Sequence, residues 1–407
     1  MNRKFNKTIK ILVILAVLLG CFSIPIYAET NSKTPVEKHG KLRLNDSNIV
    51  DKNGDKFQLR GISTHGIAWF PDYVNQEAFN YMRDEWKINV IRLAMYSDPN
   101  AGYSENTKAK VKEGVEYAKN AGLYVIIDWH ILSDGNPNIY KDEAIKFFKE
   151  MSTLYKDYDN IIYEICNEPN GDVIWDRDVK PYAEEVISEI RKIDPKTIII
   201  VGTPTWSQDV DIAAQNPIIG YDNIMYSLHF YAATHKEYLR DKLSQALNSN
   251  LPVFVTDFGV CDASGNGSLD LNESDIWINM LDENNISYVC WNLSNKNESS
   301  ALLNSSTSKL TGWTLDELSE GGKWLVNKLK EYKDETSTNN DNKAAISNEA
   351  RINNTTGESS NSLVLEESVN KQPIQNTTGE TPVVPIIVVS IIGISIIIAF
   401  VILRKRK

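Results

Sequence analysis

Two acidic side chains in this sequence stand at the ends of short apolar runs, where they could act as a pair. Glu168 is flanked by Asn167 and Pro169, and Asp257 follows a run of β-branched residues. Two carboxylates that face each other across a cleft suit the hydrolysis of a glycosidic bond, because one protonates the leaving oxygen and the other attacks or stabilises the sugar cation. We expect Glu168 to be the acid/base and Asp257 to be its charged partner.

A second set of polar and aromatic residues falls at the ends of similar runs. Three of the five histidines lie there, which random scatter would rarely produce. Arg92 lies inside an apolar run and needs a carboxylate, because an unpaired buried guanidinium is costly. The candidates are Glu168 and Asp257, and a purely structural ion pair is the alternative. The supporting residues that we expect are Arg92, His130, Asn167, His229 and Tyr231. The residues expected to contact a sugar, the aromatic ones by stacking, are His65, Trp69, Tyr96, Trp206 and Trp291.

Composition narrows the possible partners. The net charge of −11 argues against a nucleic-acid partner, which would need a basic patch, and is compatible with a neutral polysaccharide. Cys166, Cys261 and Cys290 follow neither a disulfide framework nor a metal-ligand spacing, so we expect small buried hydrophobic residues. No spacing resembles a metal or nucleotide site. We therefore expect no cofactor, no metal and a monomer.

These residues need a scaffold that brings the ends of several runs together. Eight runs are of strand length and almost continuously apolar, as a parallel sheet covered on both faces requires. They alternate with amphipathic helical stretches, although the fifth connection, around 207–215, is short. This order predicts a (β/α)8 TIM barrel over 38–332, with its chemistry at the carboxyl ends of the strands. A doubly wound open sheet is the alternative, but no Gly-rich loop follows the first run. The runs are 57–64, 89–96, 124–130, 161–168, 197–203, 224–231, 252–259 and 287–294, and the helical stretches are 75–87, 105–120, 140–157, 178–192, 234–248, 272–284 and 316–332.

The two ends of the chain differ from its body. Residues 1–28 combine a basic region, a short apolar stretch and a small-residue site, which predicts a secretory signal peptide, with an uncleaved anchor as the alternative. Residues 333–382 are polar and lack hydrophobic periodicity, which indicates a disordered tether. The stretch 383–403 is apolar and long enough for a transmembrane helix, and the basic tail 404–407 should remain cytoplasmic. We expect a secreted protein held at the cell surface by this membrane anchor, with wall attachment as the alternative.

The motifs at the predicted strand ends resemble glycoside hydrolase family 5, and within it the bacterial endo-β-1,4-glucanase (cellulase) branch. The resemblance covers about residues 38–330. It implies endo-acting hydrolysis of β-1,4-glucan by a retaining mechanism, and it adds Lys296 and Glu298 to the sugar-binding residues. Mannan, xylan and mixed-linkage glucan are alternative substrates, because loop residues decide among them. The motifs are Gly61-Ile62-Ser63-Thr64-His65-Gly66, Ile91-Arg92-Leu93, Asp128-Trp129-His130, Ile165-Cys166-Asn167-Glu168-Pro169, His229-Phe230-Tyr231-Ala232 and Trp291-Asn292-Leu293.

One position departs from the family pattern. The resemblance implies a Glu acid/base after the fourth strand, which Glu168 matches, and a Glu nucleophile at the end of the seventh strand, where this sequence has Asp257. The shorter side chain loses about 1.5 Å of reach, whereas retaining hydrolysis needs carboxyl groups about 5–5.5 Å apart. Three interpretations follow. Asp257 still attacks with reduced activity, or the wider gap admits a water and favours inversion, or the site is impaired and the chain is a surface glucan-binding protein.

Overall fold

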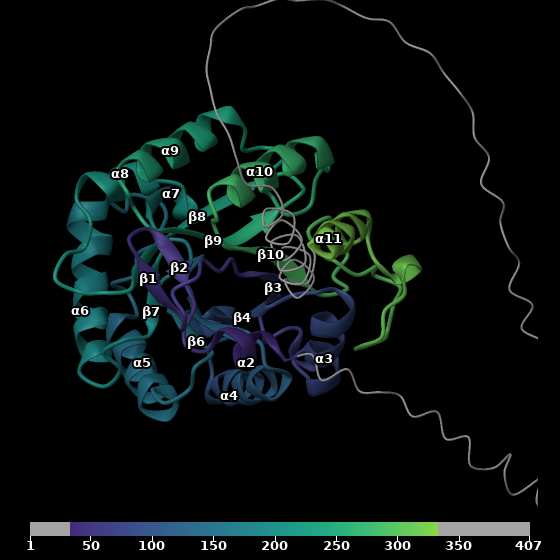
Figure 1. Cartoon of the computed structure of the whole chain (residues 1–407), viewed down its shortest axis with the longest axis horizontal. Helices are drawn as coiled ribbons and strands as arrows, with labels where there is room; N and C mark the ends of the chain where they lie inside the picture. The colour runs from purple at the N-terminus through teal and green to yellow at the C-terminus, as the bar shows by residue number, and fades with distance from the viewer. Residues whose placement is uncertain (1–32, 333–407) are drawn as a thin grey trace, which may run out of the picture. The chain divides into compact units, whose positions relative to one another are not determined.

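Eight parallel strands close into a barrel in the computed structural model, which describes residues 33–332 (Figure 1). Around the barrel the strands follow chain order, and each pairs in parallel with both of its neighbours. The predicted (β/α)8 fold is therefore confirmed, and an open sheet is excluded because the last strand pairs with the first. The strands are β3 (Arg60–Thr64), β4 (Val90–Tyr96), β5 (Tyr124–His130), β6 (Ile161–Glu164), β7 (Ile198–Val201), β8 (Ile224–Tyr231), β9 (Val253–Gly259) and β10 (Tyr288–Leu293).

The interior of the barrel has an apolar layer toward the amino ends of the strands and a polar layer toward their carboxyl ends. Alternate residues of a strand face the same side, so the inward positions recur every two residues. Two positions further toward the carboxyl end of the strand, Val90 is followed by Arg92 and Ile162 is followed by Glu164. The apolar layer holds the strands together, which leaves the polar layer available for chemistry. The buried strand residues of the apolar layer are Val90, Tyr124, Ile126, Ile162, Ile198, Ile200, Met225, Phe254 and Val289.

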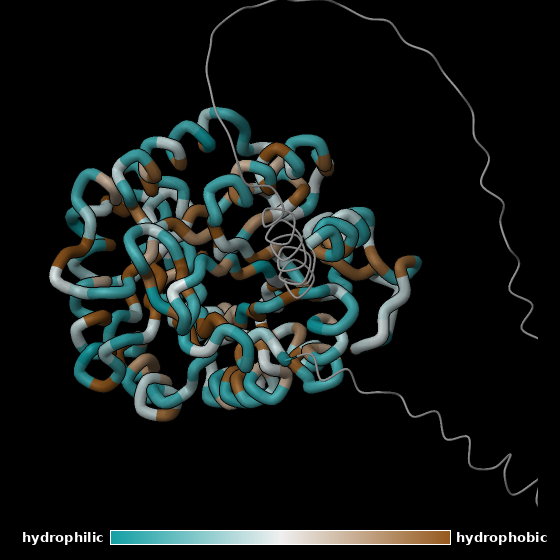
Figure 2. Tube along the Cα trace, in the orientation of Figure 1, coloured by the Kyte–Doolittle hydropathy of each residue, from teal (hydrophilic) through white to brown (hydrophobic). Residues whose placement is uncertain are grey.

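Helices cover the outer face of the barrel, with hydrophobic and hydrophilic residues alternating along them (Figure 2). In α4, Ser104 caps the first turn, Val111, Val115 and Ala118 form the buried face, and Gly122, with φ of 65°, ends the helix. Each predicted helical stretch overlaps a helix, and the short fifth connection is confirmed as α7 and α8. The helices are α2 (Pro35–His39), α3 (Gln76–Glu85), α4 (Glu105–Ala121), α5 (Lys141–Tyr155), α6 (Lys180–Arg191), α7 (Pro204–Ser207), α8 (Val210–Gln215), α9 (Glu237–Asn248), α10 (Leu271–Glu283) and α11 (Glu320–Glu331), and the 3-10 or π turns are η1 (Pro71–Tyr73), η2 (Pro99–Ala101), η3 (Trp175–Val179) and η4 (Leu315–Glu317).

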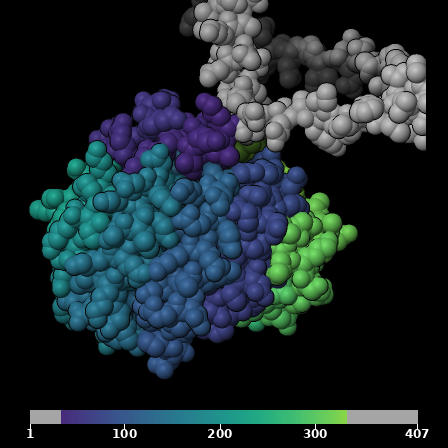
Figure 3. All heavy atoms as spheres, turned by 90° about the horizontal axis from the view of Figure 1, so that it is seen from below, coloured from purple at the N-terminus to yellow at the C-terminus, as the bar shows by residue number. Residues whose placement is uncertain are grey.

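A hairpin that the sequence did not predict covers the amino end of the barrel. Its strands are β1 (Arg43–Asn45) and β2 (Asn48–Val50), which pair antiparallel. Leu42 and Ile49 are buried and join the apolar layer. Figure 3 shows this N-terminal segment, in purple, as a layer across one end of the barrel. The hairpin therefore shields the apolar layer from water at the end opposite to the predicted chemistry.

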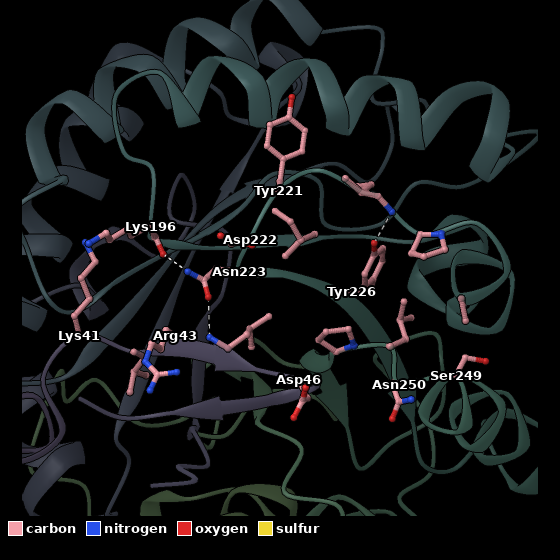
Figure 4. Close-up of a pocket in the computed structure, with 18 residues that line it drawn as sticks. Lys41, Arg43, Asp46, Lys196, Tyr221, Asp222, Asn223, Tyr226, Ser249 and Asn250 are labelled. Carbon is pink, nitrogen blue, oxygen red and sulfur yellow. Dashed lines mark hydrogen bonds between the residues drawn. The ribbon is translucent and has the colours of Figure 1, made fainter. Parts of the chain in front are cut away.

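Beside the hairpin lies a hollow of about 800 Å³ (Figure 4). Asn223 joins the hairpin to the barrel there, because its Oδ1 accepts the Leu44 N–H at 2.8 Å and its Nδ2 donates to the Lys196 carbonyl at 2.6 Å. The residues that line this hollow come from the hairpin and the residues just before it, from the loops that lead into β7, β8 and β9, and from the end of α8 and the start of β8. The hollow is thus at the amino end of the barrel, away from Glu168 and Asp257.

The predictions for the two ends of the chain lie outside the described residues. They are the signal peptide (1–28), the tether (333–382), the transmembrane stretch (383–403) and the tail (404–407). Within residues 33–332, no helix is both long and apolar enough to cross a bilayer. The cysteines in this part of the chain are free and buried, as expected of small hydrophobic residues, and they are Cys166, Cys261 and Cys290.

Candidate active site

The site residues named from the sequence meet at the carboxyl ends of the barrel strands. Most of them line one pocket of about 580 Å³. Arg92 and Asn167 are fully buried below it and hydrogen-bond to each other at 2.6 Å. Trp69 is 49% exposed at its edge, with its ring centroid 4.8 Å from that of Tyr96. The named residues that line the pocket are His65, Tyr96, His130, Glu168, Trp206, His229, Tyr231, Asp257, Trp291, Lys296 and Glu298.

Arg92 is the cationic centre of the polar layer. Its Nε donates to Glu164 Oε2 at 2.7 Å, and its Nη2 lies 3.0 Å from Asp128 Oδ2. Burial alone would lower the pKa of the guanidinium, but the surrounding carboxylates hold this pKa above its usual value. Glu168 or Asp257 was the partner predicted from the sequence. Asp257 lies 3.7 Å away, and no ion pair within residues 33–332 joins Arg92 to Glu168. The closest partners are instead Asp128 in β5 and Glu164 in β6, which are register partners of each other.

A chain of hydrogen bonds links Glu164 to Glu168 through Thr256 and His229. The Thr256 hydroxyl donates to Glu164 Oε1 at 2.7 Å. This uses the single hydroxyl proton, so in the 2.9 Å contact between Thr256 Oγ1 and His229 Nε2 the imidazole must donate. Burial lowers the pKa of His229 to about 4, which keeps the ring neutral near pH 7. Its Nδ1 is therefore unprotonated and accepts a hydrogen bond.

Glu168 supplies the proton that this Nδ1 accepts. Its Oε1 lies 2.9 Å from His229 Nδ1. Burial raises the pKa of Glu168 to about 8, and the nearby Glu164 adds to the rise while Arg92 opposes it. The backbone is fixed, because the Glu168 carbonyl accepts from Asn170 Nδ2 at 2.8 Å. A carboxylic acid is thus held protonated at neutral pH, with 14% of its side chain exposed.

Asp257 reaches the pocket because β9 carries one extra residue. Ser227 pairs with Phe254, and His229 pairs with Asp257, so β8 advances by two residues while β9 advances by three. The pairing of β9 with β10 shows the same shift. This is a β-bulge, which re-aims the residue that follows it. Without it, strict alternation from Phe254 through Thr256 would point Asp257 outward, toward the helices.

The carboxylate of Asp257 is oriented by Tyr231. The Tyr231 hydroxyl donates to Oδ1 at 3.1 Å, while Oδ2 lies 3.7 Å from Arg92 Nη1. Burial raises the pKa of Asp257 to about 7, although His229 and Arg92 oppose this rise. Oδ1 of Asp257 is thus held in place, whereas Oδ2 accepts no close hydrogen bond from any other residue in the range 33–332.

Aromatic and charged residues extend the pocket on the side of β10 and β3. Trp291 stacks on His130, with ring centroids 5.2 Å apart and planes at 17°. Lys296 Nζ lies 2.6 Å from Glu298 Oε2 and 3.4 Å from His65 Nε2. Flat aromatic rings and hydrogen-bonding groups that line the same pocket suit a pyranose, because this ring has apolar faces and hydroxyl groups around its edge.

Trp206 stands on the other side of the pocket, in a strained turn. Thr205, Trp206 and Ser207 have φ of 58°, 55° and 57°, a left-handed conformation that costs about 1–2 kcal/mol per residue outside glycine. The turn is fixed near Glu168, because Trp206 N–H donates to the Pro169 carbonyl at 3.1 Å and Ser207 Oγ donates to the Asn167 carbonyl at 2.6 Å. The Trp206 side chain is 47% exposed and lines the same pocket as Glu168.

Two groups of residues at the site were not predicted from the sequence. Glu164 and Thr256 in the polar layer escaped it, although the alternation from Ile162 and Phe254 pointed to them. The other group lies in loops, where no periodicity gives a signal. These pocket residues are Leu132, Gln208, His235, Ala263, Ser264, Gly265 and Ser300.

The fold and the pocket together define a (β/α)8-barrel glycoside hydrolase. One carboxyl group has a pKa raised by burial and hydrogen-bonds a neutral histidine, and a second one is aligned by a tyrosine in the same pocket. No group of three or more His, Cys, Asp or Glu side chains within residues 33–332 could hold a metal ion.

The chain belongs to the cellulase family, glycosyl hydrolase family 5, whose family model matches residues 50–297. It is 47% identical over 324 residues to an endoglucanase of Clostridium saccharobutylicum, and this match covers 79% of the chain and 71% of the relative. It is 49% identical to endoglucanase 5 of Pectobacterium carotovorum, covering 78% of the chain and 63% of the relative. Among solved structures, the catalytic domain of a Thermobifida fusca endoglucanase in complex with cellotetraose matches with a TM-score of 0.69 and 38% identity, covering 73% of the chain and all of that domain.

Proposed function

We propose that this chain hydrolyses internal β-1,4-glucosidic bonds in cellulose-like glucans with retention of configuration at the anomeric carbon. The observation that carries the proposal is the pairing of a protonated Glu168 with Asp257 in one pocket of a family 5 barrel. The relatives named endoglucanases, and the solved relative in complex with cellotetraose, support this substrate class.

In the first step, Glu168 gives its proton to the oxygen of the scissile bond. Asp257 Oδ2 attacks the anomeric carbon, and a glycosyl ester forms as the bond to the leaving sugar breaks. Tyr231 keeps its hydrogen bond to Oδ1, so the attacking oxygen is the one without a close donor.

In the second step, a water molecule replaces the leaving sugar. The Glu168 carboxylate takes a proton from this water, whose oxygen attacks the anomeric carbon and releases Asp257. Glu168 ends protonated and again donates to His229 Nδ1. Two displacements at one carbon retain its configuration, which distinguishes this mechanism from a single attack by water.

The proposal is tested with purified protein and soluble polysaccharides. We expect β-1,4-glucan to lose viscosity faster than it gains reducing ends, because internal cuts shorten long chains first. β-Mannan, xylan and mixed-linkage glucan, offered separately, show whether the substrate class is right. NMR of freshly formed product from a cello-oligosaccharide reports the anomer, and an initial α-anomer would show inversion instead of retention.

A second candidate, a surface glucan-binding protein, is favoured by a single observation, the short side chain of Asp257. Retaining hydrolysis requires the nucleophile within bonding reach, and a misplacement of about 1 Å can cost about 100-fold in rate. Binding of cello-oligosaccharides by calorimetry, with no product after several days, would establish this second function and contradict the first.

The pKa values predict a narrow pH range for activity. Asp257 must be ionised to attack, and its pKa of about 7 means that activity rises as the pH increases through this value. Glu168 must be protonated, and its pKa of about 8 means that activity falls above it. Because the two groups interact, the two pKa values read from the pH profile belong to the pair and not to either residue alone. We expect kcat/KM for a cello-oligosaccharide to peak between these values, and a profile that is highest near pH 5 would contradict the assignment.

For localisation, we propose secretion through residues 1–28 and retention at the cell surface by a membrane anchor at 383–403. The basic and apolar patterns of these stretches support the proposal. Fractionation of the producing cells tests it. Protein in the membrane fraction that protease removes from intact cells supports an anchor, whereas release by wall-digesting enzymes would show wall attachment.

A further inference from the structure

His235 lies in the loop between β8 and α9 and lines the pocket, yet the steps above give it no part. Its backbone is held on both sides, because its N–H donates to the Tyr231 carbonyl at 2.8 Å and its carbonyl accepts from Trp277 Nε1 at 2.8 Å. The residue is 7% exposed, and the ring of Tyr238 packs edge-on at 6.3 Å. The imidazole is therefore fixed at the pocket wall.

The hydrogen bond to its ring determines where the imidazole proton is. The Tyr231 backbone N–H donates to His235 Nδ1 at 2.8 Å, and a backbone amide can only donate. Nδ1 therefore carries no proton, and the neutral ring must carry it on Nε2. Burial lowers the pKa of His235 to about 4, so the ring stays neutral at the pH where the enzyme is expected to work. Within residues 33–332, no side chain or carbonyl accepts from Nε2.

The position of His235 relative to the acid/base shows which part of a substrate it would meet. Glu168 protonates the leaving oxygen, so the leaving sugar must lie on the side of Glu168. Trp206 is fastened to that side through the Pro169 carbonyl. His235 comes from the loop after β8, next to the β7 loop of Trp206, and both residues line the pocket. The cluster of His65, Lys296 and Glu298 occupies the opposite side.

We infer that His235 Nε2 donates a hydrogen bond to a hydroxyl oxygen of the leaving-group glucose, and that it thereby selects a sugar over a hydroxyl-free leaving group. The inference rests on the proposed glucanase function and adds a specificity residue to it. A fixed donor without a protein acceptor is best satisfied by a substrate that brings an acceptor. The expected ligand is a β-1,4-linked glucosyl unit on the leaving side of the cut.

The test compares His235→Asn with the wild type on two substrates. Asparagine can still accept the Tyr231 N–H through its Oδ1 but is too short to place a donor at the Nε2 position. The leaving group of cellopentaose is a sugar. The leaving group of 4-nitrophenyl β-cellobioside is 4-nitrophenol, whose release is measured and whose ring carries no sugar hydroxyls. We expect kcat/KM for cellopentaose to fall about fivefold to tenfold, the effect of one hydrogen bond, while nitrophenol release stays within about twofold.

The ratio of the two activities does not depend on how much of the variant folds. Tyr238→Phe is the matched control, because it alters a neighbour of His235 that does not line the pocket, and we expect no change in the ratio. An equal loss on both substrates would overturn the inference and leave His235 with a structural role. If the wild type turns over neither substrate, the proposed glucanase function is overturned, and the inference with it.

Discussion

Replacing Glu168 by Gln is expected to lower kcat/KM on β-1,4-glucan by about 100- to 10,000-fold, the usual contribution of a positioned general acid and base. The amide can still donate to His229 Nδ1, which lies 2.9 Å from the carboxyl group, so the fold and the pocket should persist. Only the transferable proton is removed. The measurement is the initial rate on soluble glucan beside an unfolding curve for each protein.

A change of leaving group tests whether Glu168 is specifically the acid. A dinitrophenyl cellobioside needs little protonation, so the Glu168→Gln variant should form the glycosyl ester from it almost normally and then hydrolyse this ester slowly. We expect a burst of dinitrophenol followed by a slow steady state. The usual loss on removing a general acid is about 100-fold or more. If the Glu168→Gln variant keeps more than about a tenth of the wild-type rate on glucan, another group protonates the leaving sugar.

Replacing Asp257 by Glu is expected to raise kcat by up to about 100-fold, because a nucleophile about 1 Å out of place costs about that factor. Glutamate adds one methylene at the position where the family pattern has this residue. The side chain of Asp257 already meets the Tyr231 hydroxyl at 3.1 Å and faces Arg92 at 3.7 Å. The longer carboxylate should keep both neighbours and extend further into the pocket.

A companion variant, Asp257→Asn, makes the Asp257→Glu result interpretable. Asp257→Asn keeps the size of the side chain and removes its charge, so it should fall below the wild type if Asp257 attacks at all. Equal activity of Asp257→Asn and the wild type would instead show that Asp257 does not act as a nucleophile. If Asp257→Glu is no faster than the wild type, the short side chain is not what limits the rate.

Much of the fold could be predicted because it depends on local patterns. A strand such as β5, buried on both faces, must be apolar along its length, and each helix must repeat its apolar residues every three or four positions. The order of these segments then leaves few topologies open. The β1–β2 hairpin was missed because each of its strands has three residues, too few for a periodic signal.

Most of the residues that line the pocket could also be predicted, but most of their partners could not. Arg92 was expected to pair with Glu168 or Asp257. Asp257 does lie 3.7 Å from it, but its closest carboxylates are Glu164 and Asp128, deeper in the barrel. Depth within a barrel depends on the stagger between strands, which no single strand encodes. His235 was missed for a related reason, since its role depends on a backbone N–H that only the folded loop brings to its ring.

The barrel and the candidate pair Glu168 and Asp257 can be predicted from residue types and periodicity, which are local properties, and the missing methylene at Asp257 follows from the resemblance to the family. The orientation of the two carboxyl groups depends on the folded barrel. The bulge in β9 turns Asp257 into the pocket. The chain from Glu164 through Thr256 fixes the proton of His229, and this leaves Nδ1 to accept from Glu168. Register and proton positions arise from contacts between distant segments, so they exist only once the barrel has closed.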